Sequence, residues 1–420
     1  MRSSFIYTSR ASCLAVLLGL AGTVPLSSRA QVAEGGSELA AVYFCEPAPL
    51  GWPGAGQGTP DARQGGPVQG NNGQGPQDEA QPTPAVEKVR KISRTFPASA
   101  TKLYTLDTRY GRVQVNVWNR PEIRTDVDVI TRADTDEKAQ QLQDMIQVQL
   151  QDKDPTTGGI VVRSRFGAMP RECWSRTKLY EVNYTVWVPK NTPMALHNTF
   201  GEISLTGDVS GATELAVEYG SLRTARLDGP RNTVRLCNAQ CSVPFARRMA
   251  VDASYSKLRL TDGGTVDLRN NSSTIDIGTV QDLTVHSKYG DVALGTVRNL
   301  RGTSGYSKFS IDKLSNQLDM KLQYCPSFEV RNTGKNFQQI NLDGGYSTIL
   351  LNFPDGVAFD FDVNTEHGQL LVDKRLVKVA SEETTAGSSD LQGSFGAAVP
   401  ARNASNVNIK VRYGNVSFNR

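Results

Sequence analysis

Tyr255-Ser256-Lys257-Leu258-Arg259-Leu260, Tyr289-Gly290-Asp291-Val292-Ala293-Leu294 and Tyr306-Ser307-Lys308-Phe309-Ser310-Ile311 share one pattern. Each stretch has an aromatic residue, a small residue, any residue, an apolar residue, any residue and a second apolar residue. An earlier copy opens with Phe200-Gly201, and weaker or outlying copies begin at Tyr110, Tyr219, Asn238, Ser272, Tyr324, Tyr346, His367 and Tyr413. From Phe200 to His367 successive copies start 17 to 22 residues apart, so the chain carries an internal repeat.

The length of this repeat limits the folds that it can build. A unit of 17 to 22 residues is too short for two helices or for a four-stranded propeller blade. It is long enough for two or three short strands that stack in parallel on the next copy, with pairs such as Ile275 and Ile277 inside. We therefore predict an all-β fold over 191–420, a parallel β-helix (β-solenoid) of about ten coils of 17–22 residues, with a polar loop insertion at 373–406.

The first two residues of each copy invite two interpretations. Apolar residues upstream of the aromatic alternate in step with it, whereas those downstream have the opposite parity, so the register is expected to slip at the small residue. In one interpretation the aromatic packs at a corner and the small residue makes room for it. In the other, the row of tyrosines stacks against sugar rings. The residues assigned to this structural repeat are Phe200, Gly201, Tyr219, Gly220, Tyr255, Ser256, Tyr289, Gly290, Tyr306, Ser307, Tyr346, Ser347, Tyr413 and Gly414.

The segments before residue 86 have the composition of an export signal and a linker. Residues 1–30 are predicted to be a signal peptide, because Arg2 and Arg10 precede a short apolar run and Ser28-Arg29-Ala30 fits a cleavage site. Residues 31–85 are predicted to be a disordered tether, because this segment is rich in Pro, Gly and Gln and poor in large apolar residues.

Residues 86–190 are predicted to be strand-rich with one helix. Alternating segments such as Val113–Trp118 favour strands. Asp134 is the expected helix cap, and Ala139 and Leu142 follow at helical spacing. A short basic run is interpreted as a solvated strand face, with contact to an anionic ligand as the alternative; it comprises Lys88, Arg90, Lys91 and Arg94.

Charge and hydropathy exclude several classes of partner. The net charge is +4, and removing the three arginines of the signal peptide leaves +1. A nearly neutral chain offers no electrostatic surface for nucleic acid or for an acidic membrane. No apolar stretch after residue 30 is long enough to cross a bilayer, so no transmembrane segment is expected in the mature chain.

The mature chain would keep five cysteines: Cys45, Cys173, Cys237, Cys241 and Cys325. Export permits disulfides, and Cys237 and Cys241 are close enough in sequence to bridge a sharp corner. The alternative is that both are small apolar fillers. No histidine lies near the pair, so no metal site and no cofactor are expected.

No motif of nucleophilic, metal-dependent or phosphate-binding catalysis occurs in the sequence. The three histidines, His197, His286 and His367, are far apart along the chain. A polysaccharide-active β-helix would need clustered carboxylates, for which the candidates on adjacent coils are Asp262, Asp267, Asp276 and Asp291. Turn formation and a solvated surface explain these residues as well, so the chain is not expected to be an enzyme.

Several segments occur together with the repeated Tyr-Gly or Tyr-Ser pairs: Tyr110–Trp118 followed by Glu122-Ile123, the Glu137-Lys138-Ala139 helix and the Tyr184–Pro189 strand. In these features the chain resembles a family of bacterial putative adhesins of unknown function. It implies a parallel β-solenoid over roughly residues 90–420 and brings no catalytic residues. The chain differs from the family in its long tether, its extra cysteines and the 373–406 insertion.

These observations predict a non-enzymatic exported protein of the cell envelope, an adhesin or surface-binding module that presents a rigid rod. The expected partner is a surface ligand, either glycan or protein. The alternative is a periplasmic envelope or signalling component that binds a membrane protein, and a polysaccharide-active enzyme is the minor alternative. Periplasm, outer cell surface and secretion all remain open as locations.

Overall fold

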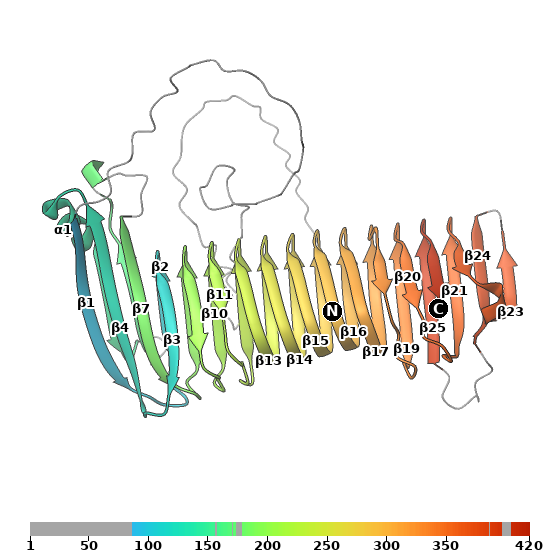
Figure 1. The fold of residues 1–420 in the computed structure, drawn as a ribbon, viewed down its shortest axis with the longest axis horizontal. Helices are drawn as coiled ribbons and strands as arrows, with labels where there is room; N and C mark the ends of the chain where they lie inside the picture. The colour runs from blue at the N-terminus through green and yellow to red at the C-terminus, as the bar shows by residue number, and fades with distance from the viewer. Residues whose placement is uncertain (1–85, 156–157, 170, 174–178, 386, 397–404) are drawn as a thin grey trace, which may run out of the picture. The chain divides into compact units, whose positions relative to one another are not determined.

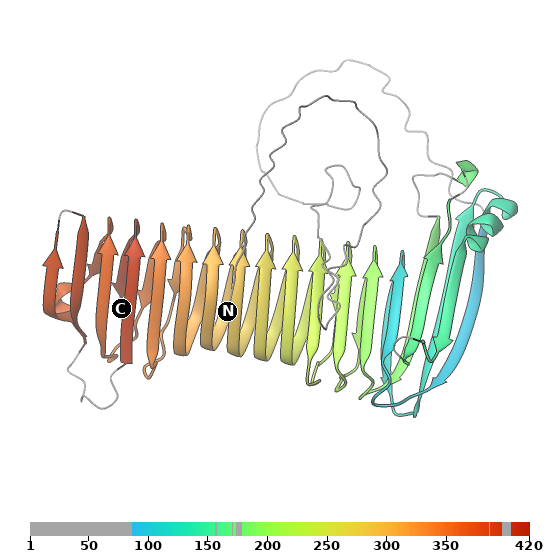
Figure 2. The same ribbon diagram turned by 180° about the vertical axis from the view of Figure 1, so that it is seen from behind.

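A computed structural model describes residues 86–420, except 156–157, 170, 174–178, 386 and 397–404. The signal peptide at 1–30 and the tether at 31–85 lie outside the described residues. The protein is all-β: 26 strands hydrogen-bond into one long sheet, and α1 (Asp136–Asp144) is the one α-helix of the described segments. The strands lie side by side in a row, which Figure 1 and the reverse view in Figure 2 both show.

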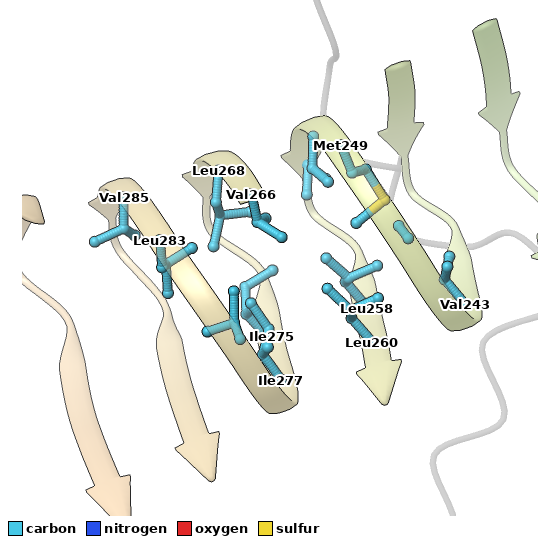
Figure 3. Close-up of a cluster of buried hydrophobic side chains, with 14 of the residues drawn as sticks. Val243, Met249, Leu258, Leu260, Val266, Leu268, Ile275, Ile277, Leu283 and Val285 are labelled. Carbon is cyan, nitrogen blue, oxygen red and sulfur yellow. The ribbon is translucent and has the colours of Figure 1, made fainter. Parts of the chain in front are cut away.

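Five long strands form the regular middle of the sheet: β13 (Gln240–Ser254), β14 (Lys257–Asn271), β15 (Thr274–Lys288), β16 (Asp291–Gly305) and β17 (Lys308–Gln323). They pair in parallel in chain order, so that Leu258 lies beside Ile275 and Ile275 beside Val292. Apolar side chains from both halves of each strand are buried against one another, as Figure 3 shows for Leu258, Leu268 and their neighbours. The predicted apolar pairs therefore stack from copy to copy.

Shorter strands continue the two halves of these long strands in both directions. The first half is extended by β9 (Glu202–Thr206), β11 (Ser221–Arg223), β18 (Phe328–Val330) and β20 (Ile349–Asn352). The second half is extended by β8 (Met194–Thr199), β10 (Thr213–Glu218), β12 (Asn232–Cys237) and β19 (Gln339–Gly345). Buried residues of both rows belong to a single hydrophobic core.

At the N-terminal end an early copy of the repeat joins the sheet. Tyr110 lies between β2 (Tyr104–Arg109) and β3 (Arg112–Trp118), which pair in parallel with β8 and β9. On their other sides β2 and β3 pair with β6 (Ile160–Phe166) and β7 (Tyr180–Pro189). The antiparallel strands β4 (Glu122–Ala133), β1 (Val86–Pro97) and β5 (Ile146–Asp152) complete this end. The outlying Tyr110 copy is thus a spatial neighbour of the Phe200 copy.

The predicted helix in this region is present, and its own residues Ala139 and Leu142 are buried. The expected cap is wrong by one residue: the Thr135 side chain accepts a bond from the Lys138 backbone N–H. Asp134 instead forms an ion pair with Lys138 at 2.8 Å.

At the C-terminal end the chain turns back and inserts its last copy between two earlier ones. β25 (Ser405–Arg412) lies between β19 and β21 (Phe359–Glu366), and β26 (Val416–Asn419) lies between β20 and β22 (Leu370–Val372). The prediction that 373–406 is a loop is wrong in part, because β23 (Val377–Thr384) and β24 (Ser388–Phe395) pair antiparallel there. Nearly every β23 residue is exposed, and its apolar alternation is confined to Val377 and Val379, which is too short a pattern to predict a strand.

Candidate functional site

Each copy of the repeat begins with a residue in the left-handed backbone region. These residues have φ between 49° and 61°: Tyr110, Phe200, Tyr219, Asn238, Tyr255, Ser272, Tyr289, Tyr306, Tyr324, Tyr346, His367 and Tyr413. Such φ values are uncommon for residues other than glycine, and bulky side chains rarely adopt them. Upstream of Tyr289, Val285 and Ser287 point inward, yet the Tyr289 side chain is 49% exposed. The left-handed residue therefore causes the change of parity seen in the sequence and turns the ring outward.

The small residue after each aromatic lies against the neighbouring copy. A Cβ placed on Gly220 would lie 1.8 Å from the Gly201 carbonyl oxygen, and one on Gly414 would lie 2.0 Å from that of Ser347. Where the residue is serine, its hydroxyl accepts a backbone N–H from the preceding copy, as Ser347 Oγ does from Cys325 N at 3.0 Å. Gly201, Gly290, Ser256 and Ser307 occupy equivalent positions. This position is therefore limited to small side chains by close backbone contact.

Outward-turned rings of successive copies stack on one another. We call Tyr289, Tyr306, Tyr324, Tyr346 and Tyr413 the tyrosine ladder. Its neighbouring ring centroids are 4.8 to 5.1 Å apart, and the His367 ring stacks on the Tyr413 ring at 4.7 Å. Each ladder ring is between 40% and 49% exposed. Four of the aromatics assigned to the structural repeat thus form a continuous half-exposed surface together with Tyr324, which opens one of the weaker copies.

Two breaks separate the tyrosine ladder from a shorter aromatic stack. Tyr110, Phe200 and Tyr219 stack at 5.3 and 5.0 Å. At the corners before and after Tyr255, Asn238 and Ser272 stand where the other copies have an aromatic residue. Tyr255 therefore has no ring to stack on at either neighbouring corner.

The stacking direction decides what the tyrosine ladder can contact. The ring planes of successive tyrosines differ by only 8° to 24°, so neighbouring rings cover one another's faces. A sugar ring stacks on an aromatic face, whereas the outward parts of these rings are edges and hydroxyl-bearing ends. Tyrosine edges and hydroxyls suit protein interfaces, where tyrosine is enriched because it combines an apolar body with a polar end.

The predicted Cys237–Cys241 disulfide is wrong. Cys241 is a buried free thiol, whereas Cys237 is disulfide-bonded. Cys237 and Cys241 lie on opposite sides of the left-handed residue Asn238 in the chain. Cys241 is buried in the core beside Leu258, whereas Cys237 is half-buried at the end of β12. Burial raises the pKa of the Cys241 thiol to about 12, which keeps it protonated and unreactive.

One cluster of charged side chains crosses three neighbouring strands. His197 on β8 faces Asp107 on β2, with Nδ1 and Oδ1 3.2 Å apart, and Glu218 on β10, with Nε2 and Oε1 3.7 Å apart. Hydrogen bonds to Asp107 and then to Glu218 raise the pKa of His197 to about 9. Burial alone would raise the pKa of Asp107, but the His197 hydrogen bond and the charges of Arg163 and Arg109 lower it. The cluster is a cross-strand ion network rather than a poised acid or base.

The remaining candidates for catalysis are not brought together. Asp276 pairs with Arg259 at 3.3 Å, and Asp267 lies on the other half of β14 beside Thr284. None of the four candidate aspartates, Asp262, Asp267, Asp276 and Asp291, lines either of the two cavities described below. His286 is exposed and its Nδ1 lies 3.0 Å from the Thr303 hydroxyl.

Three of the four side chains of the basic run on β1 make contacts with other parts of the protein. Arg90 donates to the Ile146 carbonyl at 2.5 Å, and Arg94 donates to the Leu150 carbonyl. Lys88 pairs with Asp136 at 2.7 Å. The two arginines occupy carbonyl groups along the edge of β5 that has no strand partner among the described residues, which protects that edge from pairing with another strand.

Two open cavities lie on the described surface. The larger, of about 1190 Å³, lies beside β22 and is rimmed by Arg331, Arg375 and Arg420. Each of these arginines already pairs with a carboxylate: Asp312, Asp373 and Asp355, respectively.

The smaller cavity, of about 320 Å³, lies where β15, β16 and β17 bend, and we call it the corner pocket. Its polar lining residues are Thr279, Gln281, Thr296, Arg298, Ser315 and Asn316. Sequence reasoning missed these residues. The available signal was the 18-residue step from Tyr306 to Tyr324, after four steps of 17 residues.

Within the part of the chain that the structure describes, no group of three or more His, Cys, Asp or Glu side chains is placed to hold a metal ion. No helix in those same segments has the length and apolar character needed to cross a bilayer.

No family model and no curated protein matches the chain. Among solved structures, a putative adhesin from Bacteroides fragilis gives a TM-score of 0.32 at 12% identity and covers 56% of this chain and 93% of its own. A putative cell adhesion protein from Clostridium sporogenes gives 0.20 at 9% identity, covering 79% of this chain and 99% of its own. A putative adhesin from Parabacteroides distasonis gives 0.24 at 9% identity, covering 78% and 97%. Likenesses of this degree carry no argument about the function of this chain.

Proposed function

We propose that the protein is an exported, non-enzymatic surface-binding protein whose tyrosine ladder contacts another protein. The single observation that carries the proposal is a continuous row of stacked rings, each about half exposed. Contiguous exposed aromatic surface is unusual on a soluble protein and typically marks an interaction site. The mutual stacking of the rings favours a protein partner over a glycan, because no ring face inside the row is free for a sugar.

The fold suits this role as a support. We propose that the two rows of strands belong to successive turns of a β-solenoid, which holds the repeated Tyr-Gly and Tyr-Ser corners in line. Stacked rings restrict one another's rotation, so little side-chain entropy would be lost when a partner binds. Export, with a signal peptide at 1–30 and a tether at 31–85, would place this support at the cell surface.

A ladder variant tests the contact surface directly. Asparagine already occupies the left-handed corner at Asn238, so Tyr306→Asn, Tyr324→Asn and Tyr346→Asn together should preserve the backbone. The full exported chain and this triple variant would be applied to arrays of extracellular-matrix proteins and of glycans. We expect binding to at least one protein that falls at least tenfold in the triple variant. Tyr255→Asn, outside the ladder, is the matched control and should leave this binding unchanged.

Two results would overturn the proposal. Glycan binding without protein binding would refute the choice of partner, and binding that is insensitive to the triple variant would refute the ladder as the surface. Location is tested separately by protease treatment of intact and lysed cells. Cleavage on intact cells supports surface display, whereas full protection until lysis refutes it and favours the periplasmic alternative.

A further inference from the structure

The corner pocket is the place where the otherwise regular middle of the sheet departs from its own pattern. β15 and β16 pair residue for residue, but β17 carries one more residue than β16. The register shifts between Val297 and Asn299, so that Ser315 and Asn316 together oppose Arg298. A bulge of this kind bends the strand and redirects side chains, and bulges are frequent beside binding sites.

Arg298 is the charged group of the pocket and has no carboxylate within ion-pair distance among the described residues. Arg259 pairs with Asp276, and Arg331 pairs with Asp312. Arg269 on β14 and Arg301 on β16 resemble Arg298, because they too have no carboxylate within ion-pair distance among the described residues. Arg298 differs from both because it lies at the bulge and lines the pocket. No carboxylate lines the corner pocket. A guanidinium without a local counter-ion, next to neutral donors and acceptors, favours an anionic ligand.

A short relay of side chains holds Asn316 in place. Its Nδ2 donates to Asn299 Oδ1 at 2.7 Å, and Asn299 Nδ2 donates to Asp282 Oδ1 at 2.7 Å. Because its nitrogen is used in this way, Asn316 keeps its own amide oxygen as an acceptor for a ligand hydroxyl. The pocket thus has one fixed acceptor as well as the Arg298 cation.

We propose that the corner pocket binds a carboxylate-bearing sugar residue, with Arg298 on the carboxylate and the Thr296, Ser315 and Asn316 side chains on the ring hydroxyls. The cavity of about 320 Å³ is at the small end of ligand sites, which limits it to about one sugar ring. Hydroxyl and amide groups outnumber the single charge in the lining, so the pocket offers partners for a polyol as well as for an anion. This site is separate from the tyrosine ladder and does not depend on the function proposed for the ladder.

Saturation-transfer difference NMR on the full chain tests the proposal with three probes: D-glucuronate, D-glucose and acetate. We expect D-glucuronate to bind at least tenfold more tightly than either other probe, because only it carries both the carboxylate and the ring hydroxyls. Arg298→Gln should weaken D-glucuronate binding at least tenfold. Gln281 lies beside Arg298 on β15, so glutamine is compatible with this position.

The matched control is Arg269→Gln, which removes an exposed arginine from β14 outside the pocket and should leave the affinity within twofold. Thr296→Val is a second pocket variant and is expected to weaken D-glucuronate binding about threefold. If Arg298→Gln does not fold, this variant still tests the proposal. The proposal is overturned by absent D-glucuronate binding, by equal binding of acetate, or by equal effects of Arg298→Gln and Arg269→Gln. Unchanged D-glucuronate binding in the tyrosine-ladder variant would support an independent site.

Discussion

The regular middle of the sheet and its C-terminal end are built from the same repeat, but they assemble it differently. From β13 to β17 each strand pairs with its neighbours in the chain. At the C-terminal end the Tyr413 copy lies between the Tyr346 and His367 copies, although it follows both in sequence. The repeat therefore specifies the shape and pairing surface of a unit, whereas long-range pairing decides which units become neighbours.

The largest expected effect comes from breaking the interior of the regular middle. Ile277→Ala removes a fully buried side chain and should lower the free energy of unfolding by about 4 kcal/mol, because a cavity remains between tightly stacked neighbours. Urea unfolding followed by circular dichroism measures this. Leu371→Ala at the C-terminal end is the control, because Leu371 is exposed and should cost less than about 0.5 kcal/mol. Equal effects of the two variants would contradict a closely packed interior.

The next prediction concerns the inserted C-terminal copy. Gly414→Ala would place a Cβ 2.0 Å from the Ser347 carbonyl oxygen, so the two copies would have to separate, at a cost of about 3 kcal/mol. Hydrogen exchange should show the loss of protection concentrated in β25 and β26, with β13–β17 little changed. At Gly305 in the middle, an added Cβ would meet only the Gln323 oxygen at 3.8 Å, so Gly305→Ala should be tolerated. Uniform loss of protection across the sheet would refute this arrangement of copies.

The same contrast explains what the sequence could predict. The strand pattern, the apolar pairs and the small corner residues are local features, since each follows from the alternation and spacing within one copy. The insertion of the Tyr413 copy is not a local feature. Nothing in the six residues of this copy shows whether it pairs beyond the His367 copy or between the His367 and Tyr346 copies. β23 was missed for a related reason: it is exposed along nearly its whole length, and its apolar alternation stops after Val377 and Val379.

The two parts of the candidate site, the tyrosine ladder and the corner pocket, also differ in how far the sequence could predict them. Every aromatic of the tyrosine ladder was visible in the sequence as part of the repeat, but their exposure was not, because it depends on the left-handed backbone at each corner. The corner pocket was hidden for the opposite reason. It arises from one extra residue in β17, whose only trace in the sequence is a step of 18 rather than 17 residues.

A smaller, pH-dependent effect is expected where the N-terminal copies meet. His197 has a pKa of about 9 in the folded protein, above its ordinary value of 6.5, because the protonated ring is bound by Asp107 and Glu218. A raised folded-state pKa means that the contribution to stability is complete below pH 6.5 and is lost as the pH rises through about 9. The free energy of unfolding should fall by about 2 kcal/mol across this range.

His197→Gln should remove most of this pH dependence, as measured by urea unfolding at a series of pH values. Arg109 and Arg163 remain in the variant, so Asp107 keeps cationic neighbours and the structure should persist. His286→Gln, on an exposed histidine of the regular middle, is the control and should keep the wild-type slope. A slope that survives in His197→Gln would contradict the role of this ion network.

The smallest predicted effect separates ring stacking from corner geometry. Tyr306 stacks on rings on both sides, at 5.1 and 4.8 Å, whereas the neighbours of Tyr255 at this corner are Asn238 and Ser272. Asparagine suits the left-handed corner, so replacing either tyrosine by asparagine leaves the backbone cost nearly equal. Tyr306→Asn should therefore cost about 1 kcal/mol more than Tyr255→Asn, the difference being the lost stacking. If the two variants unfold at the same urea concentration, the ladder rings contribute little to the stability of the sheet, and their ordered exposure is better explained by what they bind.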